Sequence, residues 1–356
     1  MEPPIAPRIA VVGAGAVGGY VGAGLAAAGH DVTLIDPWPD HVEAIRAGGM
    51  HLSGMTEAET RIVRVPALHL TEVQALARQR PIDIAFVAVK SYDTEWATLM
   101  IAPYLSPAGV VVSLQNCINE ERIAALIGWG RTMGTVVSGG LALDLYEPAH
   151  IRRTMAKLPG HTCLYVGEPS GRVTARARAL AALLGAVDGT HATDDLWGER
   201  WTKLCVNGMR NGVSAATGMG GNERDRHDAV RRVCIRLGAE SVRVGRALGF
   251  RVGKVGALDP EALARAGDND PAALAEVERL MLAGTTGAAR SDLQRPSMAQ
   301  DMAKGRRTEI EFMNGFIAAK ATEAGVPAPT HARLTEVVKQ VERGILRPDP
   351  SNVLWN

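Results

Sequence analysis

The chain has 356 residues, which exceeds one ordinary domain of about 150 residues and predicts two or three domains. Its 39 Lys and Arg against 38 Asp and Glu leave a net charge of +1, so no strong field attracts it to nucleic acid or to an anionic membrane. A hydrophobic content of 46% and a charged content of 22% exclude a disordered or collagen-like chain and favour a folded protein that binds a small molecule.

The segment from residue 9 to residue 29 carries no charge and is long enough to be considered as a membrane span. Glycine and alanine fill most of it, so the Leu, Ile and Phe residues that drive membrane insertion are nearly absent. We therefore expect no span here.

The same segment has the layout of a dinucleotide-binding turn. Residues 8–12 predict a buried strand, a helix follows to about residue 28, and residues 31–35 predict a second strand. The intervening G-x-G-x-x-G pattern allows a tight turn, close approach of a pyrophosphate and close helix–strand packing. An ordinary glycine-rich turn remains the alternative. The candidate cofactor-binding residues here are Gly13, Ala14, Gly15, Ala16, Val17 and Gly18.

An acidic residue, Asp36, follows the second strand, 36 − 18 = 18 positions after Gly18. A carboxylate about 20 positions after the motif accepts hydrogen bonds from the adenosine ribose of NAD, and it would repel the 2′-phosphate of NADP. Pro37 and Trp38 follow, in place of an arginine that could pair with that phosphate. NAD is therefore the predicted preference over NADP, while a turn residue before proline is the other interpretation of Asp36.

Strand-like and helical runs alternate further along the chain, which indicates a parallel sheet covered on both faces. After about residue 194 the periodicity becomes helical. The sequence therefore predicts the α/β fold class, with a Rossmann-type dinucleotide-binding domain over residues 1–193 and a mainly α-helical substrate and dimerisation domain over residues 194–356. The strand-like runs are 82–89, 109–114, 133–137 and 162–166, and a helical run spans about 91–104.

Two segments of the second domain have a loop-like composition. Residues 251–296 are rich in Gly, Pro, Asp and Ala and predict an insertion or lid-like excursion with one short helix at 271–283. Residues 346–356 resemble a tail.

Metal and thiol chemistry have no sequence signature here. The nine histidines never come within five positions of one another, so no zinc motif exists. The four cysteines form no C-x-x-C and no secretory signal precedes them, so we expect a reducing, cytoplasmic compartment. The cysteines are Cys117, Cys163, Cys205 and Cys234.

A polar stripe in the second domain holds Lys203, Asn207 and Asn211 at positions i, i+4 and i+8. This spacing predicts that all three lie on one helix face. Asparagine is a poor helix former whose amide both donates and accepts, so two of them beside a lysine favour ligand recognition. Surface polarity or hydrogen bonds between helices are the alternatives.

Ser297 and Glu309 belong to a second polar stretch. Ser297 with Gln300 fits a capping box, which would make Ser297 the N-cap of a helix, although its hydroxyl could also bind a carboxylate there. Glu309 is either functional or one of two acids on an exposed face. In the first domain, Lys90 and Asn116 follow predicted strands, where doubly wound sheets bind ligands.

Five motifs taken in order resemble the ketopantoate reductase family over nearly the whole chain. The resemblance implies a Rossmann domain, a helical domain and an active site in the cleft, where a nicotinamide cofactor reduces a 2-oxo acid to a 2-hydroxy acid. The motifs are G-A-G-A-V-G at 13–18, V-K-S-Y-D-T at 89–94, L-Q-N at 114–116, K-L-x-x-N-x-x-x-N at 203–211, and S-M-x-Q-D with T-E-I-E at 297–311.

The resemblance also implies roles for individual residues. Lys203 matches the catalytic lysine that gives a proton to the carbonyl oxygen, and Asn207 and Asn211 match amides that orient the substrate, Asn207 beside the catalytic step. Ser297 matches the hydroxyl on the substrate carboxylate, and Glu309 matches a carboxylate near substrate and cofactor. The residues implied at the cofactor or the cleft are Lys90, Asn116 and Gly140.

Three departures from the family pattern leave the substrate open. Asp36 and Pro37 stand where many relatives carry arginine, Cys117 and Asn119 stand where the pattern has glycine, and the 251–296 excursion is long. A catabolic NAD-dependent alcohol or hydroxy-acid dehydrogenase and a non-enzymatic NAD-binding module stay as alternatives. We also expect a homo-oligomer, a dimer, and neither a metal nor a nucleic acid or membrane partner.

Overall fold

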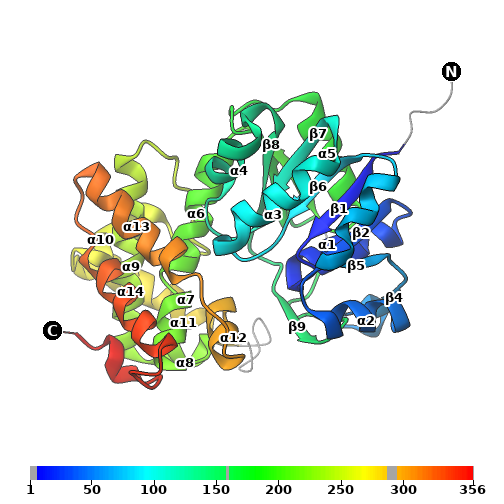
Figure 1. Cartoon of the computed structure of the whole chain (residues 1–356). Coiled ribbons are helices and arrows are strands. Elements are labelled where there is room, and N and C mark those ends of the chain that lie inside the picture. The colour runs from blue at the N-terminus through cyan, green and yellow to red at the C-terminus, as the bar shows by residue number, and fades with distance from the viewer. Residues whose placement is uncertain (1–5, 158–159, 287–294, 356) are drawn as a thin grey trace. The chain divides into compact units, whose positions relative to one another are not determined.

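The computed structural model describes residues 6–157, 160–286 and 295–355. The chain divides into two compact units, residues 1–196 and residues 197–356 (Figure 1). The first unit contains strands and helices, and the second is mainly helical. The structure thus has the predicted fold class.

An eight-stranded sheet forms the centre of the first unit, in the order β12-β11-β8-β7-β6-β1-β2-β5. Neighbouring strands are parallel, except that β11 runs antiparallel to β8. The strands are β1 Arg8–Val12, β2 Asp31–Asp36, β5 Ala67–His69, β6 Ile82–Val87, β7 Leu105–Ser113, β8 Thr132–Val137, β11 Leu164–Gly167 and β12 Thr190–Thr193.

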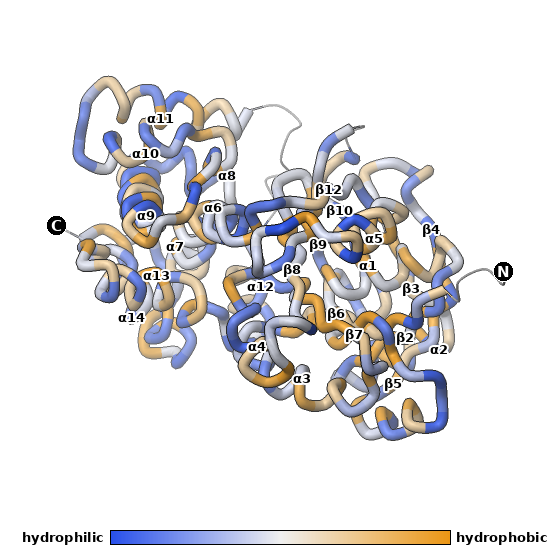
Figure 2. Tube along the Cα trace, turned by 90° about the horizontal axis from the view of Figure 1, so that it is seen from above, coloured by the Kyte–Doolittle hydropathy of each residue, from blue (hydrophilic) through white to orange (hydrophobic). Residues whose placement is uncertain are grey.

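The strand sequences explain why this sheet is buried on both faces. Every residue of β1 is buried, and its side chains alternate between two hydrophobic clusters. Ile9 and Val11 belong to one cluster, and Ala10 and Val12 belong to the other. Such continuous apolar runs are typical of parallel strands covered by helices. Figure 2 shows hydrophobic residues along β6 and β7 as well. The helices of this unit are α1 Ala16–Ala27, α2 Pro39–Gly48, α3 Thr94–Ile101, α4 Glu120–Ile127 and α5 Ala175–Gly185.

A second sheet of four short strands, in the order β4-β3-β10-β9, packs against α1. The contact is close, since a Cβ on Gly19 would lie 2.5 Å from Cδ1 of Ile151. The sequence did not indicate this sheet. Its strands are β3 Met50–Ser53, β4 Arg61–Val63, β9 Leu143–Glu147 and β10 His150–Arg153. Among the described residues, the 3₁₀ turns are η1 Glu57–Glu59, η2 Leu70–Arg78, η3 Ser91–Asp93, η4 Ala102–Tyr104, η5 Trp129–Arg131 and η7 Pro350–Val353.

The second unit is organised around the long helix α9. Trp201 of α6 is buried, stacks on Phe250 with ring centroids 5.1 Å apart, and donates from Nε1 to the carbonyl oxygen of Ser241 on α9. The helices are α6 Leu196–Gly208, α7 Asn211–Thr217, α8 Gly221–Arg226, α9 Asp228–Ala247, α10 Pro260–Gly267, α11 Pro271–Ala283, α12 Ser297–Ala303, α13 Ile310–Ala324 and α14 Pro329–Glu342.

The short helix predicted at 271–283 is confirmed as α11, but the lid-like excursion predicted for 251–296 is wrong for the part that the structure describes. Leu263 of α10 and Val277 of α11 are fully buried, and a Cβ on Gly238 of α9 would lie 2.9 Å from Leu263. The Asp and Pro residues that suggested a loop are helix starts, because Asp259 and Asp270 accept hydrogen bonds as N-caps ahead of a proline in the first turn. Residues 287–294 lie outside the described residues.

The C-terminal segment is not a free tail either. The backbone N–H of Asp349 and the Nδ2 of Asn352 both donate to the carbonyl oxygen of Ala216 on α7, at 3.1 and 2.9 Å. Val353 is fully buried. The segment therefore packs on the helical unit as far as residue 355.

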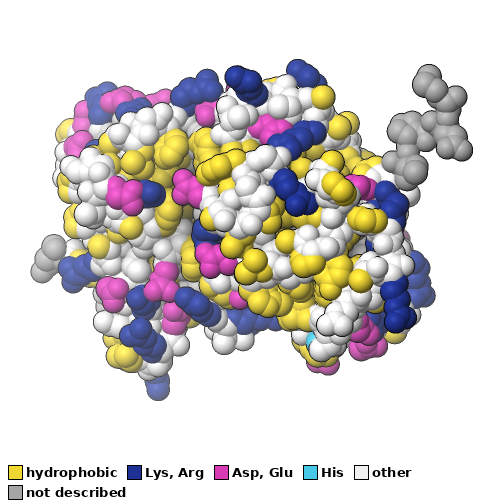
Figure 3. Space-filling model, turned by 45° about the horizontal axis from the view of Figure 1, so that its top comes forward, with side chains coloured by type: hydrophobic (Ala, Val, Ile, Leu, Met, Phe, Trp, Pro, Cys, Tyr) yellow, Lys and Arg dark blue, Asp and Glu magenta, His cyan; other side chains and the backbone are white. Residues whose placement is uncertain are grey.

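Within the described ranges, no helix is both long and apolar enough to cross a membrane. Nor do three or more His, Cys, Asp or Glu residues of that part gather as metal ligands. On the face drawn in Figure 3, Lys and Arg side chains are interspersed with Asp and Glu side chains. That face offers no broad field of one sign to a polyanion.

Candidate active site

The glycine-rich loop joins β1 to α1 at the point where the strand order reverses, between β1, β2 and β6. Gly13 has a φ of 94°, and a Cβ there would lie 2.8 Å from the backbone nitrogen of Val89. A Cβ on Gly18 would lie 2.0 Å from the carbonyl oxygen of Gly13. Both glycines are therefore required by the turn and by the approach of α1 to the sheet.

Gly15 has a different environment, because no heavy atom lies within 4 Å of the place its Cβ would occupy. It is the N-cap of α1, without a side-chain cap, and no acidic residue is in the first turn. The N–H groups at this helix start are thus open to an anion and complement its charge. This loop fits the pyrophosphate of a dinucleotide.

Asp36 ends β2 and is 9% exposed. Its Oδ2 accepts a hydrogen bond from the backbone N–H of Ala14 at 2.8 Å, and its Oδ1 accepts one from the N–H of Trp38 at 2.9 Å. The carboxylate therefore fixes the glycine-rich loop and also forms the turn that the sequence left as an alternative. An ionised carboxylate has about four acceptor sites, so these bonds leave capacity for a ribose hydroxyl.

Lys90 and Asn116 are partly exposed in turns that follow β6 and β7. Gln115 joins the two turns, because its Nε2 donates to the carbonyl oxygen of Val89 at 2.9 Å and to Oγ1 of Thr94 at 2.8 Å. Asn119 continues the network, with Nδ2 donating to the carbonyl oxygen of Asn116 at 2.9 Å.

Cys117, one of the departures from the family pattern, lies in the same turn with a φ of 65°. Glycine adopts this backbone conformation without strain, whereas a side chain rarely does. The turn thus has a backbone conformation typical of glycine while it carries a buried thiol side chain.

Gly140 has a sufficient explanation without a ligand. Its φ is 91°, and a Cβ there would lie 2.6 Å from Nε2 of His161. Its carbonyl oxygen accepts a hydrogen bond from Nη2 of Arg153 at 2.8 Å. The backbone turn alone requires glycine, and a contact with cofactor stays a prediction.

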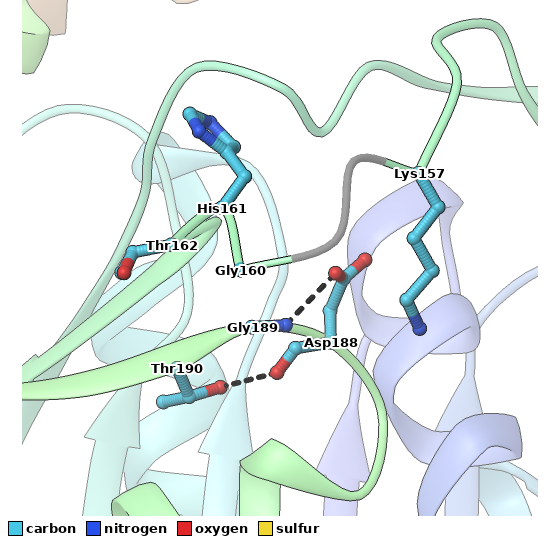
Figure 4. A pocket seen from close by; sticks show the side chains of 7 residues that line it. All are labelled: Lys157, Gly160, His161, Thr162, Asp188, Gly189 and Thr190. Carbon is cyan, nitrogen blue, oxygen red and sulfur yellow. Dashed lines mark hydrogen bonds between the residues drawn. The ribbon is translucent and has the colours of Figure 1, made fainter.

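A pocket in this unit contains none of the residues predicted from the sequence (Figure 4). It lies at the starts of β11 and β12, where Asp188 accepts from the N–H of Gly189 at 2.9 Å. The Asp188 carboxylate also pairs with Arg153 and accepts from the hydroxyl of Tyr20 at 3.1 Å. This carboxylate ties α1 and β10 to the edge of the main sheet.

Lys203, Asn207 and Asn211 do not share one helix, which corrects the prediction of a continuous face. Helix α6 carries Lys203 and Asn207 and ends at Gly208, and α7 begins at Asn211. The carbonyl oxygen of Gly208 accepts a hydrogen bond from a residue far away in the sequence, because Nδ2 of Asn314 donates to it at 2.8 Å. An uninterrupted helix would use that carbonyl for the N–H of residue 212.

Lys203 is partly exposed, and its pKa is lowered from 10.5 to about 8. Burial, which disfavours the charged ammonium, is the larger cause, and the positive charge of Arg210 is the smaller. A lysine with this pKa can both give and take a proton near neutral pH.

Asn211 and Ser297 meet although they are 86 residues apart, with Nδ2 of Asn211 donating to Oγ of Ser297 at 3.4 Å. Ser297 is the first residue of α12, and Pro296 is the N-cap, without a side-chain hydrogen bond. The capping box was therefore wrong, and Gln300 instead donates from Nε2 to the carbonyl oxygen of Arg295 at 3.0 Å. The proline fixes the chain entry to the helix, which leaves the Ser297 hydroxyl to face Asn211.

Glu309 and Glu311 differ sharply although they are neighbours. Glu309, which precedes α13, is 4% exposed, whereas Glu311 is exposed and pairs with Arg307 and Lys339. An acid on an exposed face is thus the correct description of Glu311 and the wrong one for Glu309.

Comparison with known proteins covers both units. Residues 9–164 match the family described as "Ketopantoate reductase PanE/ApbA", and residues 195–342 match "Ketopantoate reductase PanE/ApbA C terminal". The chain belongs to the ketopantoate reductase family. It is therefore an oxidoreductase of a family that acts on CH–OH groups with NAD(P)H.

Named relatives of this ketopantoate reductase family member match almost end to end. The 2-dehydropantoate 2-reductase of Archaeoglobus fulgidus is 30% identical over 339 residues, covering 95% of this chain and 99% of that protein. A solved ketopantoate reductase from Ralstonia eutropha JMP134 is 28% identical with a TM-score of 0.74, covering 95% of this chain and 99% of that one.

A third neighbour shares the fold but carries a different name. D-mandelate dehydrogenase, solved with NADH and anilino(oxo)acetate, is 23% identical with a TM-score of 0.76 and covers 95% of this chain and 99% of that one. Proteins with this fold are thus named for more than one substrate.

Sequence reasoning missed the residues that hold this family member's predicted site in place. Gln115, Asn119 and Asn314 are buried polar side chains bonded to backbone carbonyls of the turns that carry Lys90, Asn116 and Asn211. Only the amide-rich stretch at 115–119 hinted at such a role.

Proposed function

We propose that the protein catalyses NAD(P)H-dependent reduction of a 2-oxo acid to a 2-hydroxy acid, and the reverse oxidation, with Lys203 as general acid and base. The observation that carries this proposal is the pKa of Lys203, lowered to about 8 on a helix that also presents the buried amide of Asn207. In this account residues 1–193 bind the cofactor and residues 194–356 provide the substrate and proton-transfer groups.

The proton transfer follows from the charge of the reacting group. A nicotinamide cofactor held by residues 13–18 would supply the hydride for the carbonyl carbon. As the C=O π bond breaks, the oxygen takes a proton from the Lys203 ammonium, which becomes a neutral amine and regains a proton from solvent. An ammonium beside a developing alkoxide supplies both charge stabilisation and the proton.

Substrate binding is assigned to four polar side chains and one turn. Asn207 and Asn211 are 8% and 7% exposed, and their amides can both donate to and accept from a 2-oxo acid. Asn211 orients the hydroxyl of Ser297 through their 3.4 Å hydrogen bond, and that hydroxyl is proposed to bind the substrate carboxylate. Glu309 is proposed to lie near the substrate hydroxyl and the cofactor. Asn116 is proposed to contact both the substrate and the cofactor.

NAD is the proposed preferred cofactor, with its pyrophosphate on residues 13–18. The support is Asp36, a carboxylate at the end of β2 with spare acceptor capacity, which would repel a 2′-phosphate. Lys90 and Gly140 are proposed as further cofactor contacts.

A catabolic dehydrogenase that oxidises an alcohol or hydroxy acid is the second candidate. Asp36 favours it, because NAD suits net oxidation. Cys117 and Asn119, which depart from the family pattern in the turn of Asn116, leave the substrate open. The four buried, free cysteines fit a cytoplasmic setting. A dimer is proposed as the assembly, which sedimentation would test.

The decisive experiment is a panel of 2-oxo acids and hydroxy acids assayed by nicotinamide absorbance with all four cofactor forms. The proposal expects turnover of at least one 2-oxo acid with NADH, faster than with NADPH. Binding of NADH without turnover of any carbonyl or hydroxy compound would favour the non-enzymatic module instead.

A further inference from the structure

Asn314, a fully buried residue of α13, bonds the backbone at the point where α6 ends. Its Nδ2 donates to the carbonyl oxygen of Gly208, the last residue of α6, at 2.8 Å. The side-chain amide of a distant helix thus bonds the carbonyl oxygen that would accept from the N–H of residue 212 if α6 continued. A new helix, α7, begins at Asn211.

Two glycines allow this close approach. A Cβ on Gly208 would lie 2.9 Å from Cδ1 of Ile317, and a Cβ on Gly212 would lie 3.1 Å from Oδ1 of Asn314. The glycines lie on both sides of Asn211, so the chain around this residue is shaped to receive α13.

His331 fixes which way the Asn314 amide points. Burial lowers the pKa of His331 from 6.5 to about 4, so the ring is neutral at neutral pH. Its Nε2 lies 2.9 Å from the carbonyl oxygen of Leu237 and carries the proton, which leaves Nδ1 to accept from Nδ2 of Asn314 at 3.0 Å. A reversed amide would turn its oxygen toward two acceptors, Nδ1 and the Gly208 carbonyl.

The other atom of the amide shows that packing does not explain this residue. Oδ1 of Asn314 is buried, and no hydrogen-bond partner for it is found among the described residues. Leaving a buried polar group without a hydrogen bond lowers the stability of the folded state. An apolar side chain would avoid that cost, but it could not donate to Gly208.

We propose that Asn314 is a positioning residue that holds the break between α6 and α7, and thereby sets Asn207 and Asn211 for the substrate. The inference rests on the proposed function of these two asparagines. Because α13 begins directly after Glu309, the same hydrogen bond also ties the start of this helix to the break.

The test compares Asn314→Asp and Asn314→Ala with Ser241→Ala as a matched control. Asn314→Asp keeps the shape of the side chain but loses the N–H donor. If the buried carboxylate prevents folding, the smaller and neutral Asn314→Ala is used in its place. Ser241 is equally buried and its Oγ lies 2.9 Å from Nε2 of the same His331, but that hydroxyl donates to the carbonyl oxygen of Leu237 and not to that of Gly208. All three changes therefore weaken one network, and only the first two remove the bond to the break.

Two readouts separate positioning from stability. Hydrogen exchange of residues 208–214 is expected to rise about tenfold or more in the Asn314 variants and to change less than about threefold in Ser241→Ala. The KM for the 2-oxo acid is expected to rise about tenfold or more in the Asn314 variants only, with the Kd for NADH unchanged.

Equal exchange in the Asn314 variants and the control would overturn the proposal, whether or not a substrate is known. Faster exchange with an unchanged KM would overturn it too. A failure of the proposed function would give a different result: the unaltered protein would not turn over any of the 2-oxo acids tested.

Discussion

Asp36 and His41 hold the two backbone polar groups of one residue, Ala14, in the middle of the glycine-rich loop. Oδ2 of Asp36 accepts from the N–H of Ala14 at 2.8 Å, and Nε2 of His41 donates to its carbonyl oxygen at 2.9 Å. The tautomer of His41 follows because its Nδ1 accepts from the N–H of Ala149 at 2.9 Å. The loop is thereby fixed by an acidic side chain on one side of Ala14 and by an imidazole on the other.

This pair separates the charge of Asp36 from its structural role. Asp36→Asn is expected to raise the ratio of kcat/KM for NADPH to kcat/KM for NADH about tenfold or more, because the change removes the repulsion between the carboxylate and the 2′-phosphate. A tenfold change in this ratio corresponds to about 1.4 kcal/mol. His41→Ala perturbs the same loop without changing this charge, so it should weaken both cofactors and leave their ratio unchanged. A preference for NADPH in the unaltered protein would refute the prediction.

The glycine-rich loop offers a second matched pair. Gly15→Ala places a Cβ in open space and is expected to leave the melting temperature unchanged while raising the Kd for NADH about tenfold. Gly18→Ala drives a Cβ to 2.0 Å from the Gly13 carbonyl oxygen and is expected to cost about 3 kcal/mol of unfolding free energy or more. Fluorescence titration and urea unfolding measure the two effects, and unchanged cofactor binding in Gly15→Ala would contradict the assigned pyrophosphate site.

The pH dependence of turnover follows from the pKa of Lys203. Reduction needs the protonated lysine, so its rate is expected to fall as the pH rises through about 8, and the reverse oxidation should rise through the same range. Because Arg210 lowers this pKa, Arg210→Gln should move both midpoints to higher pH. Arg243, which pairs with Asp268, is a suitable control for a change of net charge, and Arg243→Gln should leave the midpoints in place.

The buried His331 predicts loss of stability in acid. Its folded pKa is about 4 against 6.5 in the unfolded chain, so protonation favours unfolding as the pH falls from 6.5 toward 4. At pH 5 this loss amounts to about 2 kcal/mol, and His331→Gln should remove it while lowering stability at pH 7. Urea unfolding at both pH values measures the difference, and an equal loss in the variant would contradict it.

The parts of the fold that the sequence predicted are those whose signals are local. The strands at 8–12 and 31–36 and the helix at 16–27 lie close to the expected positions, because the glycine spacing and the apolar runs are contained within each segment. The small sheet escaped prediction because β3 pairs with β10, about 100 residues away, and each strand spans only a few residues.

The candidate site residues were predicted by type, spacing and family resemblance, but their arrangement also depends on distant partners. The carbonyl oxygen at the break after Gly208 is bonded by Asn314, 106 residues further along, and the pattern of residues 203–211 does not contain this partner. Ser297 failed as an N-cap because Pro296 takes that position. A long-range hydrogen bond, which a local pattern does not contain, accounts for the first error, whereas the second has a local cause, the proline directly before Ser297.

Turnover by Lys203→Ala tests the central claim most directly. The account predicts that kcat for 2-oxo acid reduction falls by about 10²- to 10⁴-fold while the Kd for NADH stays unchanged. Thr202→Val serves as the control, because Thr202 is the adjacent residue of α6 and only accepts a hydrogen bond from the N–H of Gly253, so its turnover should persist. A Lys203→Ala enzyme with unchanged kcat would contradict the assignment of Lys203 as the proton donor.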